Sequence, residues 1–302
     1  MERSHLLMTL LGLGRIGRRK AEFICTHNSL AIIEAGLGAL TAKGLLPKSV
    51  TQTAIEQAVR SAAASISLCH EHGWQIVNKL DPGFPCRLQQ ISDPPVLLYC
   101  HGDTAGLSAF PSVAVIGTRA PSPAAEATAY FLGRQLAKLR AAVVSGLALG
   151  CDAAAHRGCL EQGGYTAAVL PSGLDTIYPP QNQELAARIA ATGCLLSEYP
   201  PGIRPARYRF VERDRLQSGL SDVVIVVESD IQGGAMHTAR FAKRQGRRVL
   251  VFSPTSLNDS QQASGNQKLL ATGAEAVTSV EEAIEMIRAM QPGQSGEIGT
   301  LF

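Results

Sequence analysis

Five short apolar segments recur between residues 113 and 228, and each one ends in a turn of small or polar residues. The segments are Val113–Ile116, Ala142–Val144, Ala167–Leu170, Cys194–Leu196 and Val223–Val227. Stretches with helical patterning fill the gaps between them. Because strands that alternate with helices pair in parallel, the pattern predicts an α/β fold with a doubly wound, mostly parallel sheet. Ligands of such sheets bind beyond the carboxyl ends of the strands, so the turns after these segments are the expected site.

Composition narrows the class of protein. A chain of 302 residues has room for one large or two modest domains, and 45% hydrophobic residues is ordinary for a globular protein. No apolar run reaches the roughly 18 residues that a membrane span needs, and the N-terminus lacks a convincing signal-peptide cleavage site. The seven cysteines include no C-x-x-C pair, which gives no support to a zinc or thioredoxin-type site and suits reduced thiols. We therefore expect a cytoplasmic protein without a membrane partner.

Changes of composition along the chain predict three parts. Residues 1–70 have helical patterning and form an expected small N-terminal helical domain. Residues 71–290 form the expected sheet domain, in which 71–112 is a lead-in of short extended segments and turns. Residues 291–302 contain many Gly and polar residues and are an expected flexible tail, whose final Leu-Phe loosely resembles peptides that dock on the bacterial sliding clamp.

Positive charge is concentrated in two places, although the net charge is only +3. Residues 1–60 carry eight Lys and Arg against four acids, and residues 204–215 carry five arginines against two acids. Such patches can track nucleic-acid phosphates, and a solvated charged surface gives the same composition. The second patch interleaves arginines with aromatic rings, which suits single-stranded nucleic acid because rings stack on bases. Its candidate phosphate ligands are Arg207, Arg209, Arg213 and Arg215.

The first patch surrounds a G-x-G-x-x-G sequence at Gly12–Gly17. A dinucleotide fingerprint would need a preceding strand, a second strand at Leu30–Ile33 and a ribose-binding acid at Glu34. The preceding segment, Leu6–Leu11, is as helical as it is strand-like, and cations crowd the turn. A helix-hairpin-helix, with a DNA-contacting or only a packing role, explains the same residues better. Its candidate DNA contacts are Arg15, Arg18, Arg19 and Lys20.

The turn after the first apolar segment is Gly117-Thr118-Arg119. Glycine lets a ligand approach the backbone closely, threonine can donate a hydroxyl, and arginine can hold a phosphate through two N–H groups. A surface turn with an exposed arginine would have the same sequence. The turn is therefore a candidate phosphate site, supported by its place after a buried strand rather than by its sequence alone.

Other turns supply further candidates for DNA or phosphate binding. They are Ser145 and Gly146 after the second segment, Ser172, Gly173 and Tyr178 after the third, and Gly233, Gly234 and Thr238 where a helix is expected to begin. Tyr178 could stack on a base or only pack at the rim. Two glycines ahead of a helix give an N-terminus that accepts an anion, and Thr238 could add a hydroxyl.

Asp152 and His156 lie four residues apart on one expected helix after the second segment. Asp152 is expected to cap this helix, with His156 one turn later on the same face. A nucleophile–histidine–acid triad with Ser145 is conceivable, but no G-x-S-x-G elbow surrounds the serine. We favour a structural Asp/His pair beside the pocket and predict no catalytic residue.

Together these motifs resemble the DNA-processing protein A (DprA/Smf) family over roughly residues 70–277. The matching sequences, in one order, include Asp81–Pro85, Asp93–Tyr99, Gly117–Arg119, Ser145–Asp152, Ala168–Asp175, Leu196–Gly202 and Gly265-Asn266. The resemblance implies an extended Rossmann-like domain that binds single-stranded DNA, usually as a homodimer, and helps load a RecA-type recombinase in natural transformation. It also implies a helical N-terminal domain of the helix-hairpin-helix or SAM-like kind and no catalytic activity. Arg119, Arg213 and Arg215 fall on the family's DNA-pocket positions, and we predict no metal or cofactor.

The chain departs from the family pattern at the arginine tract. Phe210-Val-Glu-Arg-Asp-Arg215 stands where the family usually has Phe-Pro-x-Arg-Asn-Arg. Glu212 and Asp214 are therefore expected to place two negative charges beside the phosphate ligands, each weakening DNA binding by about 1 kcal/mol. We interpret the chain as a divergent member of the family.

Two alternatives remain open. Some relatives of the family look like antitoxins that bind phosphoribosyltransferase-like toxins in phage-defence loci, and a divergent member could have that role. A nucleotide phosphoribohydrolase is a second alternative, because Gly233-Gly234 and Thr238 faintly resemble the P-G-G-x-G-T-x-x-E sequence of those enzymes. The catalytic glutamate of that sequence has no counterpart, since Arg240 and Phe241 follow Ala239.

Overall fold

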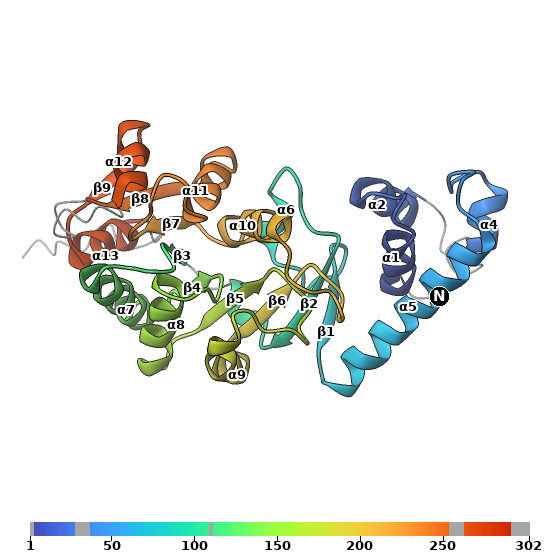
Figure 1. The fold of residues 1–302 in the computed structure, drawn as a ribbon, viewed down its shortest axis with the longest axis horizontal. Coiled ribbons are helices and arrows are strands. Elements are labelled where there is room, and N and C mark those ends of the chain that lie inside the picture. Colours follow the sequence, from blue (N-terminus) through green and yellow to red (C-terminus); the bar gives the residue numbers. More distant parts are fainter. Residues whose placement is uncertain (1–2, 28–36, 109–110, 254–262, 291–302) are drawn as a thin grey trace, which may run out of the picture.

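The computed structural model describes residues 3–27, 37–108, 111–253 and 263–290. Its strands form one nine-stranded sheet in the order β1-β2-β6-β5-β4-β3-β7-β8-β9 (Figure 1). Strands β3 to β9 pair in parallel, whereas β2 pairs antiparallel with both β1 and β6. The strands are β1 (Gln75–Asn78), β2 (Leu97–Gly102), β3 (Ser112–Ile116), β4 (Ala142–Ser145), β5 (Thr166–Leu170), β6 (Cys194–Ser197), β7 (Val223–Val226), β8 (Arg248–Phe252) and β9 (Glu275–Val277). The predicted doubly wound, mostly parallel α/β sheet is confirmed.

The five apolar segments of the sequence are the inner strands β3 to β7, with bounds that differ from the predicted ones by no more than one residue. Every residue of these five strands is buried. Because helices cover both faces of the sheet, neither side of a strand meets water. The strands are therefore continuously apolar instead of alternating between apolar and polar residues.

Helices form a layer on each face of the sheet (Figure 1). One layer consists of α7 (Pro123–Lys138), α8 (Cys151–Glu161), α9 (Gln183–Thr192) and α13 (Val280–Arg288). The other consists of α6 (Cys86–Gln89), α10 (Arg207–Gly219), α11 (Ala235–Arg244) and α12 (Ser264–Ala271). Short 3-10 helices lie in two connections, η1 (Ala105–Ser108) and η2 (Pro180–Asn182). Each layer has its own apolar core: Leu132 of α7 packs in the cluster of Val113 and Val115, and Leu216 of α10 packs with Val169.

Strands β3 and β7 are neighbours in the sheet although β4, β5 and β6 lie between them in sequence. The chain leaves β3 for α7 in one layer and leaves β7 for α11 in the other, which is the arrangement that opens a crevice beyond the strand ends. Glu228, just after β7, is fully buried and accepts hydrogen bonds from the backbone N (2.7 Å) and Oγ (3.0 Å) of Ser122. Since Ser122 is the N-cap of α7, this carboxylate fixes the helix to the neighbouring strand at the crevice.

Asn266 ties α12 to the ends of two strands. Its Nδ2 donates to the carbonyl oxygens of Val227 (2.8 Å) and Phe252 (2.9 Å), and its Oδ1 accepts from the backbone N of Ser229 (2.8 Å). The side chain is fully buried, so all three hydrogen bonds are shielded from water.

The N-terminal segment is helical, as predicted, and lies beyond β1 and β2 (Figure 1). Its described helices are α1 (Arg3–Gly12), α2 (Arg18–His27), α4 (Leu37–Ala42) and α5 (Gln52–Glu71). Leu6 and Leu10 of α1 belong to one buried cluster with Tyr99 of β2 and Leu195 of β6. The apolar core is therefore continuous across the predicted boundary at residue 70, and the division into two domains stays a prediction.

The helix α1 contradicts the dinucleotide fingerprint, because Leu6–Leu11, where that motif needs a strand, is helical. Gly12 is the last residue of α1, and Gly14 and Gly17 lie between α1 and α2, which form the predicted helical hairpin. The proposed second strand at 30–33, Glu34 and the tail at 291–302 lie outside the described residues. Among the described helices, none is both long and apolar enough to span a membrane.

Candidate functional site

A cavity of about 230 Å³ lies beyond the carboxyl ends of β3 and β7, where the sheet topology predicts a ligand site. Several predicted site residues line it: Gly117, Thr118, Arg119, Arg213, Gly233, Gly234 and Thr238. The turn after β3 and the start of α11 form two of its walls, and α10 forms a third. Residues that the sequence did not single out as ligands also line it: Asp152, Phe210, Asp214, Gln217 and Asp230.

The helix α10 presents two different faces. Phe210, Arg213, Asp214 and Gln217 line the cavity, and their spacing of three, four and seven residues places them on one side of a helix. The same helical period would have identified Gln217 from the sequence once Arg213 was chosen as a ligand. Arginines that lie two residues apart in this tract therefore do not share one face of the helix, because each residue of a helix is rotated by about 100° from the one before it.

Arg213 is 5% exposed and is held by backbone oxygens. Its Nη1 donates to the carbonyl of Gly146, just after β4, and to that of Val169 in β5, both at 2.8 Å. Its Nε lies 3.2 Å from Oδ1 of Asp214. A Cβ at Gly146 would lie 1.8 Å from Nη1 of Arg213, so only glycine leaves room for this side chain.

Gln217 continues the same hydrogen-bonded wall. In the amide orientation that satisfies both of its ends, Oε1 accepts from the backbone N of Gly146 (2.8 Å) and from Nη1 of Arg213 (3.2 Å). Its Nε2 then donates to Oγ1 of Thr238 at 3.1 Å. The predicted Thr238 hydroxyl is thus at the cavity, and Gln217 joins it to the arginine.

Two buried carboxylates face the arginine. Oδ2 of Asp152 accepts hydrogen bonds from the backbone N of Gly146 (3.1 Å) and of Ala148 (3.3 Å). Burial raises the pKa of Asp152, and Arg213 together with these two N–H groups opposes that shift. Burial also raises the pKa of Asp214, to about 7, against the attraction of Arg213. Glu212 and Asp214 are the two acids that the sequence placed near the phosphate ligands. Of these two, Asp214 is the one that lines the cavity.

Aromatic rings border the cavity opening. The Arg119 guanidinium lies 5.1 Å from the Phe210 ring centroid, and Tyr178 packs edge-on against the same ring at 5.5 Å. Arg119, Gly146, Tyr178 and Phe210 also line a smaller adjoining hollow of about 50 Å³. Tyr178 is 39% exposed, so one side of the ring is open to a ligand. A cation next to exposed rings suits a phosphate followed by a base.

Several other predicted residues do not line either hollow, which corrects the expected set. Oγ of Ser145 donates to the carbonyl of Val115 (2.6 Å), and Oγ of Ser172 donates to that of Thr176 (2.7 Å). Both serines are fully buried, because their hydroxyls satisfy backbone oxygens inside the fold. Gly173 is closely packed: a Cβ there would lie 2.6 Å from the carbonyl oxygen of Pro200.

Arg207 and Arg209 lie in the first turn of α10, outside the cavity. Arg207 is exposed. The guanidinium of Arg209 lies over the rings of Tyr199 (5.4 Å) and Tyr208 (5.1 Å) and donates to the carbonyl of Arg204. These arginines and the exposed Tyr208 form a basic, aromatic surface next to the cavity opening.

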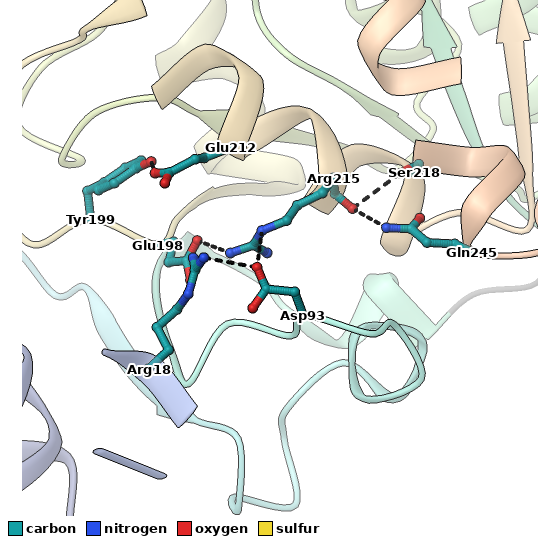
Figure 2. A network of polar contacts seen from close by, with 8 residues as sticks. All are labelled: Arg18, Asp93, Glu198, Tyr199, Glu212, Arg215, Ser218 and Gln245. Carbon is teal, nitrogen blue, oxygen red and sulfur yellow. Dashed lines mark hydrogen bonds and ion pairs between the residues drawn. The ribbon is translucent and has the colours of Figure 1, made fainter. Parts of the chain in front are cut away.

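Arg215 points away from the cavity, into the polar network of Figure 2. It is 4% exposed and pairs with Glu198 and with Asp93, whose Oδ2 lies 3.4 Å from its Nε. Glu212 lies on this same side of α10, where its Oε2 accepts a hydrogen bond from the Tyr199 hydroxyl at 2.5 Å. The expectation that Glu212 stands beside the phosphate ligands is therefore corrected, because helical geometry directs it to the other face.

The basic side chains of the N-terminal hairpin also fall into two groups, one exposed to solvent and one directed into the protein. Arg15, Arg19 and Lys20 are exposed. Arg18 is directed inward: its Nη1 lies 2.8 Å from Oε1 of Glu198, and its Nη2 lies 2.9 Å from Oδ2 of Asp93. Arg18 thus connects α2 to the network of Arg215, while the other three cations remain available to a ligand.

The expected structural pair of Asp152 and His156 is held by separate contacts, because each side chain is bonded to different groups. Gly150 is the N-cap of α8, and Asp152 lies in its first turn, bonded to the preceding loop. Nδ1 of His156 is 2.6 Å from Oγ1 of Thr166, and complete burial lowers the pKa of this imidazole to about 3. Ser145 interacts with Asp152, but His156 is bonded to Thr166 and, within the described residues, has no hydrogen bond to either of them, so the geometry gives no catalytic triad. Nor do the described residues contain a group of three or more side chains suited to hold a metal.

The fold and the cavity define a Rossmann-like α/β protein with an arginine-containing site at its topological switch point. The chain matches the family described as DNA recombination-mediator protein A over residues 75–288, and it belongs to that family. It is 39% identical to Protein Smf from Synechocystis over 221 residues, which cover 72% of this chain and 54% of that protein. The chain thus corresponds to about half the length of that relative.

Solved structures show the same relationship. DNA processing protein A from Streptococcus pneumoniae covers 94% of both chains at 29% identity, with a TM-score of 0.72. DNA processing protein A from Helicobacter pylori, whose structure is described by its single-stranded DNA binding mode, is 34% identical, with a TM-score of 0.65. That match covers 72% of this chain and 96% of the Helicobacter chain. The resemblance predicted from the sequence motifs is confirmed.

Proposed function

We propose that this chain binds single-stranded DNA in DNA processing and recombination, and that a backbone phosphate occupies the cavity at the switch point. The convergence of Arg119 and Arg213 on one cavity carries the proposal. Gly233 and Gly234 precede α11 at the same cavity, where a helix N-terminus favours an anion. Membership of the family and the DNA binding described for the Helicobacter relative support the same ligand.

The residues take different roles in this proposal. Arg119 is exposed and supplies a mobile cation, while Arg213 supplies a fixed one. Tyr178 and Phe210 provide rings on which a neighbouring base can stack. Arg215 is a positioning residue, because it holds α10 through the network on the opposite face. The exposed Arg15, Arg19, Lys20 and Arg207, together with the half-buried Arg209, extend the path of the strand outside the cavity.

The same proposal includes the finer functions that the family resemblance implies. These are formation of a homodimer and loading of a RecA-type recombinase, in the cytoplasm and without catalysis by this chain. The family match and the names of the relatives favour DNA processing over the toxin-partner alternative. The nucleotide-hydrolase alternative has less support, because the catalytic glutamate of that motif has no counterpart after Ala239, where Arg240 and Phe241 follow.

Fluorescence anisotropy of a labelled oligothymidine, titrated at two salt concentrations, tests the proposal. Arg119→Ala and Arg213→Ala are compared with Arg288→Ala, an exposed arginine at the end of α13 in the opposite helix layer. We expect salt-sensitive binding that duplex DNA competes for poorly. Arg119→Ala should weaken binding and reduce the slope of log affinity against log salt by about 0.7, the value for one single-strand phosphate. Absence of binding at low salt, or equal binding by all three variants, would contradict the proposed site.

A further inference from the structure

Negative charge outnumbers positive charge in the cavity that we assign to a phosphate. Among the described residues, five charged side chains line it: Arg119, Arg213, Asp152, Asp214 and Asp230. With all three carboxylates ionised, the lining carries one more negative than positive charge. Such a lining repels a phosphate unless one carboxylate loses its charge or a cation enters with the ligand.

A metal cation is not the simplest solution. The described residues contain no cluster of three or more acidic, histidine or cysteine side chains arranged to hold one. Arg213 cannot correct the balance by turning toward a ligand, because its Nη1 is held by the carbonyls of Gly146 and Val169. The remaining way to remove the excess negative charge is to protonate one of the three carboxylates.

The three carboxylates differ in how well their charges are stabilised. Asp230 is exposed and accepts a hydrogen bond from the backbone N of Gln232 at 2.7 Å. Asp152 accepts two backbone hydrogen bonds, from Gly146 and Ala148. The side chain of Asp214 is only 8% exposed, and its polar partner in the described part of the chain is Arg213. Asp214 is therefore the acid whose charge is most weakly supported.

We propose that binding of a nucleic-acid phosphate in this cavity is coupled to uptake of one proton by Asp214. This inference rests on the proposed function and adds its regulation by pH. When Asp214 is neutral, the cavity no longer carries excess negative charge, and Nε of Arg213 loses its ionic partner. The part of the guanidinium that no longer pairs with Asp214 can then interact with a phosphate, while Nη1 keeps its hydrogen bonds to the backbone.

The surroundings of Asp214 determine how strongly the coupling responds to pH. Arg213 on its own helix and Arg119 in the turn after β3 favour its ionised form, and Asp152 on α8 opposes it. Asp230 faces the cavity from the loop after β7, and the α11 wall adds only groups without a charge, Gly234, Ala235 and Thr238. Burial outweighs the arginines and brings the pKa of Asp214 to about 7. The neutral fraction then falls from about nine tenths at pH 6 to about one tenth at pH 8, so the apparent Kd should rise about tenfold.

The test measures oligothymidine binding at pH 6, 7 and 8 and constant ionic strength, with the full chain. Asp214→Asn keeps the size of the side chain and the Oδ1 acceptor but is neutral at every pH. Glu281→Gln is the control, because it removes the charge of an exposed carboxylate on α13, outside the cavity. We expect the unaltered protein and Glu281→Gln to lose about tenfold in affinity from pH 6 to pH 8. Asp214→Asn should bind at pH 8 about as tightly as at pH 6.

The possible outcomes separate this proposal from the function on which it rests. If Asp214→Asn loses affinity with pH as steeply as the unaltered protein, another group takes up the proton and the inference is wrong. If the unaltered protein binds equally well at pH 6 and pH 8, no coupling exists. If neither the protein nor Asp214→Asn binds at any pH, the proposed DNA function itself fails. Circular dichroism of each variant at each pH establishes that the compared proteins are folded.

Discussion

Arg18 and Arg215 pair with opposite oxygens of one carboxylate, that of Glu198, although 197 residues separate the two arginines (Figure 2). Asp93 also receives both guanidinium groups on its Oδ2. Four side chains from four parts of the chain thus form one network. It joins the N-terminal hairpin to the face of α10 opposite the cavity, so the hairpin supports the helix that carries Arg213.

Arg18→Ala should lower the free energy of unfolding by about 1–2 kcal/mol, because Glu198 is nearly buried and loses one of its two cations. Urea unfolding measures the change. Arg19→Ala is the control, since Arg19 is exposed on the same helix and should change stability by less than about 0.5 kcal/mol. Equal effects of the two substitutions would show that the network adds no stability.

Gly146→Ala should impair both the cavity and the fold. The added Cβ would lie 1.8 Å from Nη1 of Arg213, so the guanidinium must leave the two carbonyls that hold it. We expect a loss of about 1–3 kcal/mol in stability and a clear loss of oligothymidine affinity. Gly38→Ala, where a Cβ meets open space, should leave DNA binding unchanged. Normal affinity of Gly146→Ala would show that Arg213 does not need its present position.

Asp214 should make stability depend on pH without any ligand. Its pKa is about 7 in the folded protein against 3.8 for an ordinary aspartate, so the folded state binds more protons between these values. Its contribution is therefore most favourable below about pH 4 and is lost as pH rises through 7. Asp214→Asn should be more stable than the unaltered protein by on the order of 2–4 kcal/mol at pH 8, with the difference shrinking toward pH 4. Urea unfolding at several pH values measures this, and a constant difference would contradict the raised pKa.

Asn266→Ala should destabilise the fold by at least about 2 kcal/mol, because it leaves a buried N–H and two buried carbonyls without a partner. Thermal unfolding is the measurement. Lys268→Ala, an exposed change on the same helix, should be nearly neutral. If both variants unfold at the same temperature, the three hydrogen bonds at the ends of β7 and β8 contribute little.

Much of the fold could be predicted because burial on both faces leaves a simple signal. The segments that became β3 to β7 are uniformly apolar, and glycine or serine follows where the chain must turn at the crevice. The position of the cavity followed from the topology of parallel sheets. The link between Arg18 and Glu198 could not be predicted, since sequence separation hides contacts between surfaces that meet only after folding.

The site was predicted less completely, and α10 shows why. The alternating arginines of 207–215 suggested one continuous basic surface, but a helix distributes them over several faces. Arg213 and Asp214 face the cavity, while Glu212 and Arg215 face the network. The burial of Arg213, Asp214 and Arg215 could not be predicted either. A charged residue in a polar sequence gives no local sign that it will lie inside the protein.

Arg213 is a proposed phosphate ligand, and its two hydrogen bonds to the backbone also connect the end of β4 to β5. We therefore expect an arginine at this position even in a homologue that no longer binds DNA, because its loss would destabilise the sheet. Arg119, which is exposed and makes no such contact between strands, is free to disappear once its ligand does. Among relatives of this chain, the residue at position 119 should thus be the better marker of a working site.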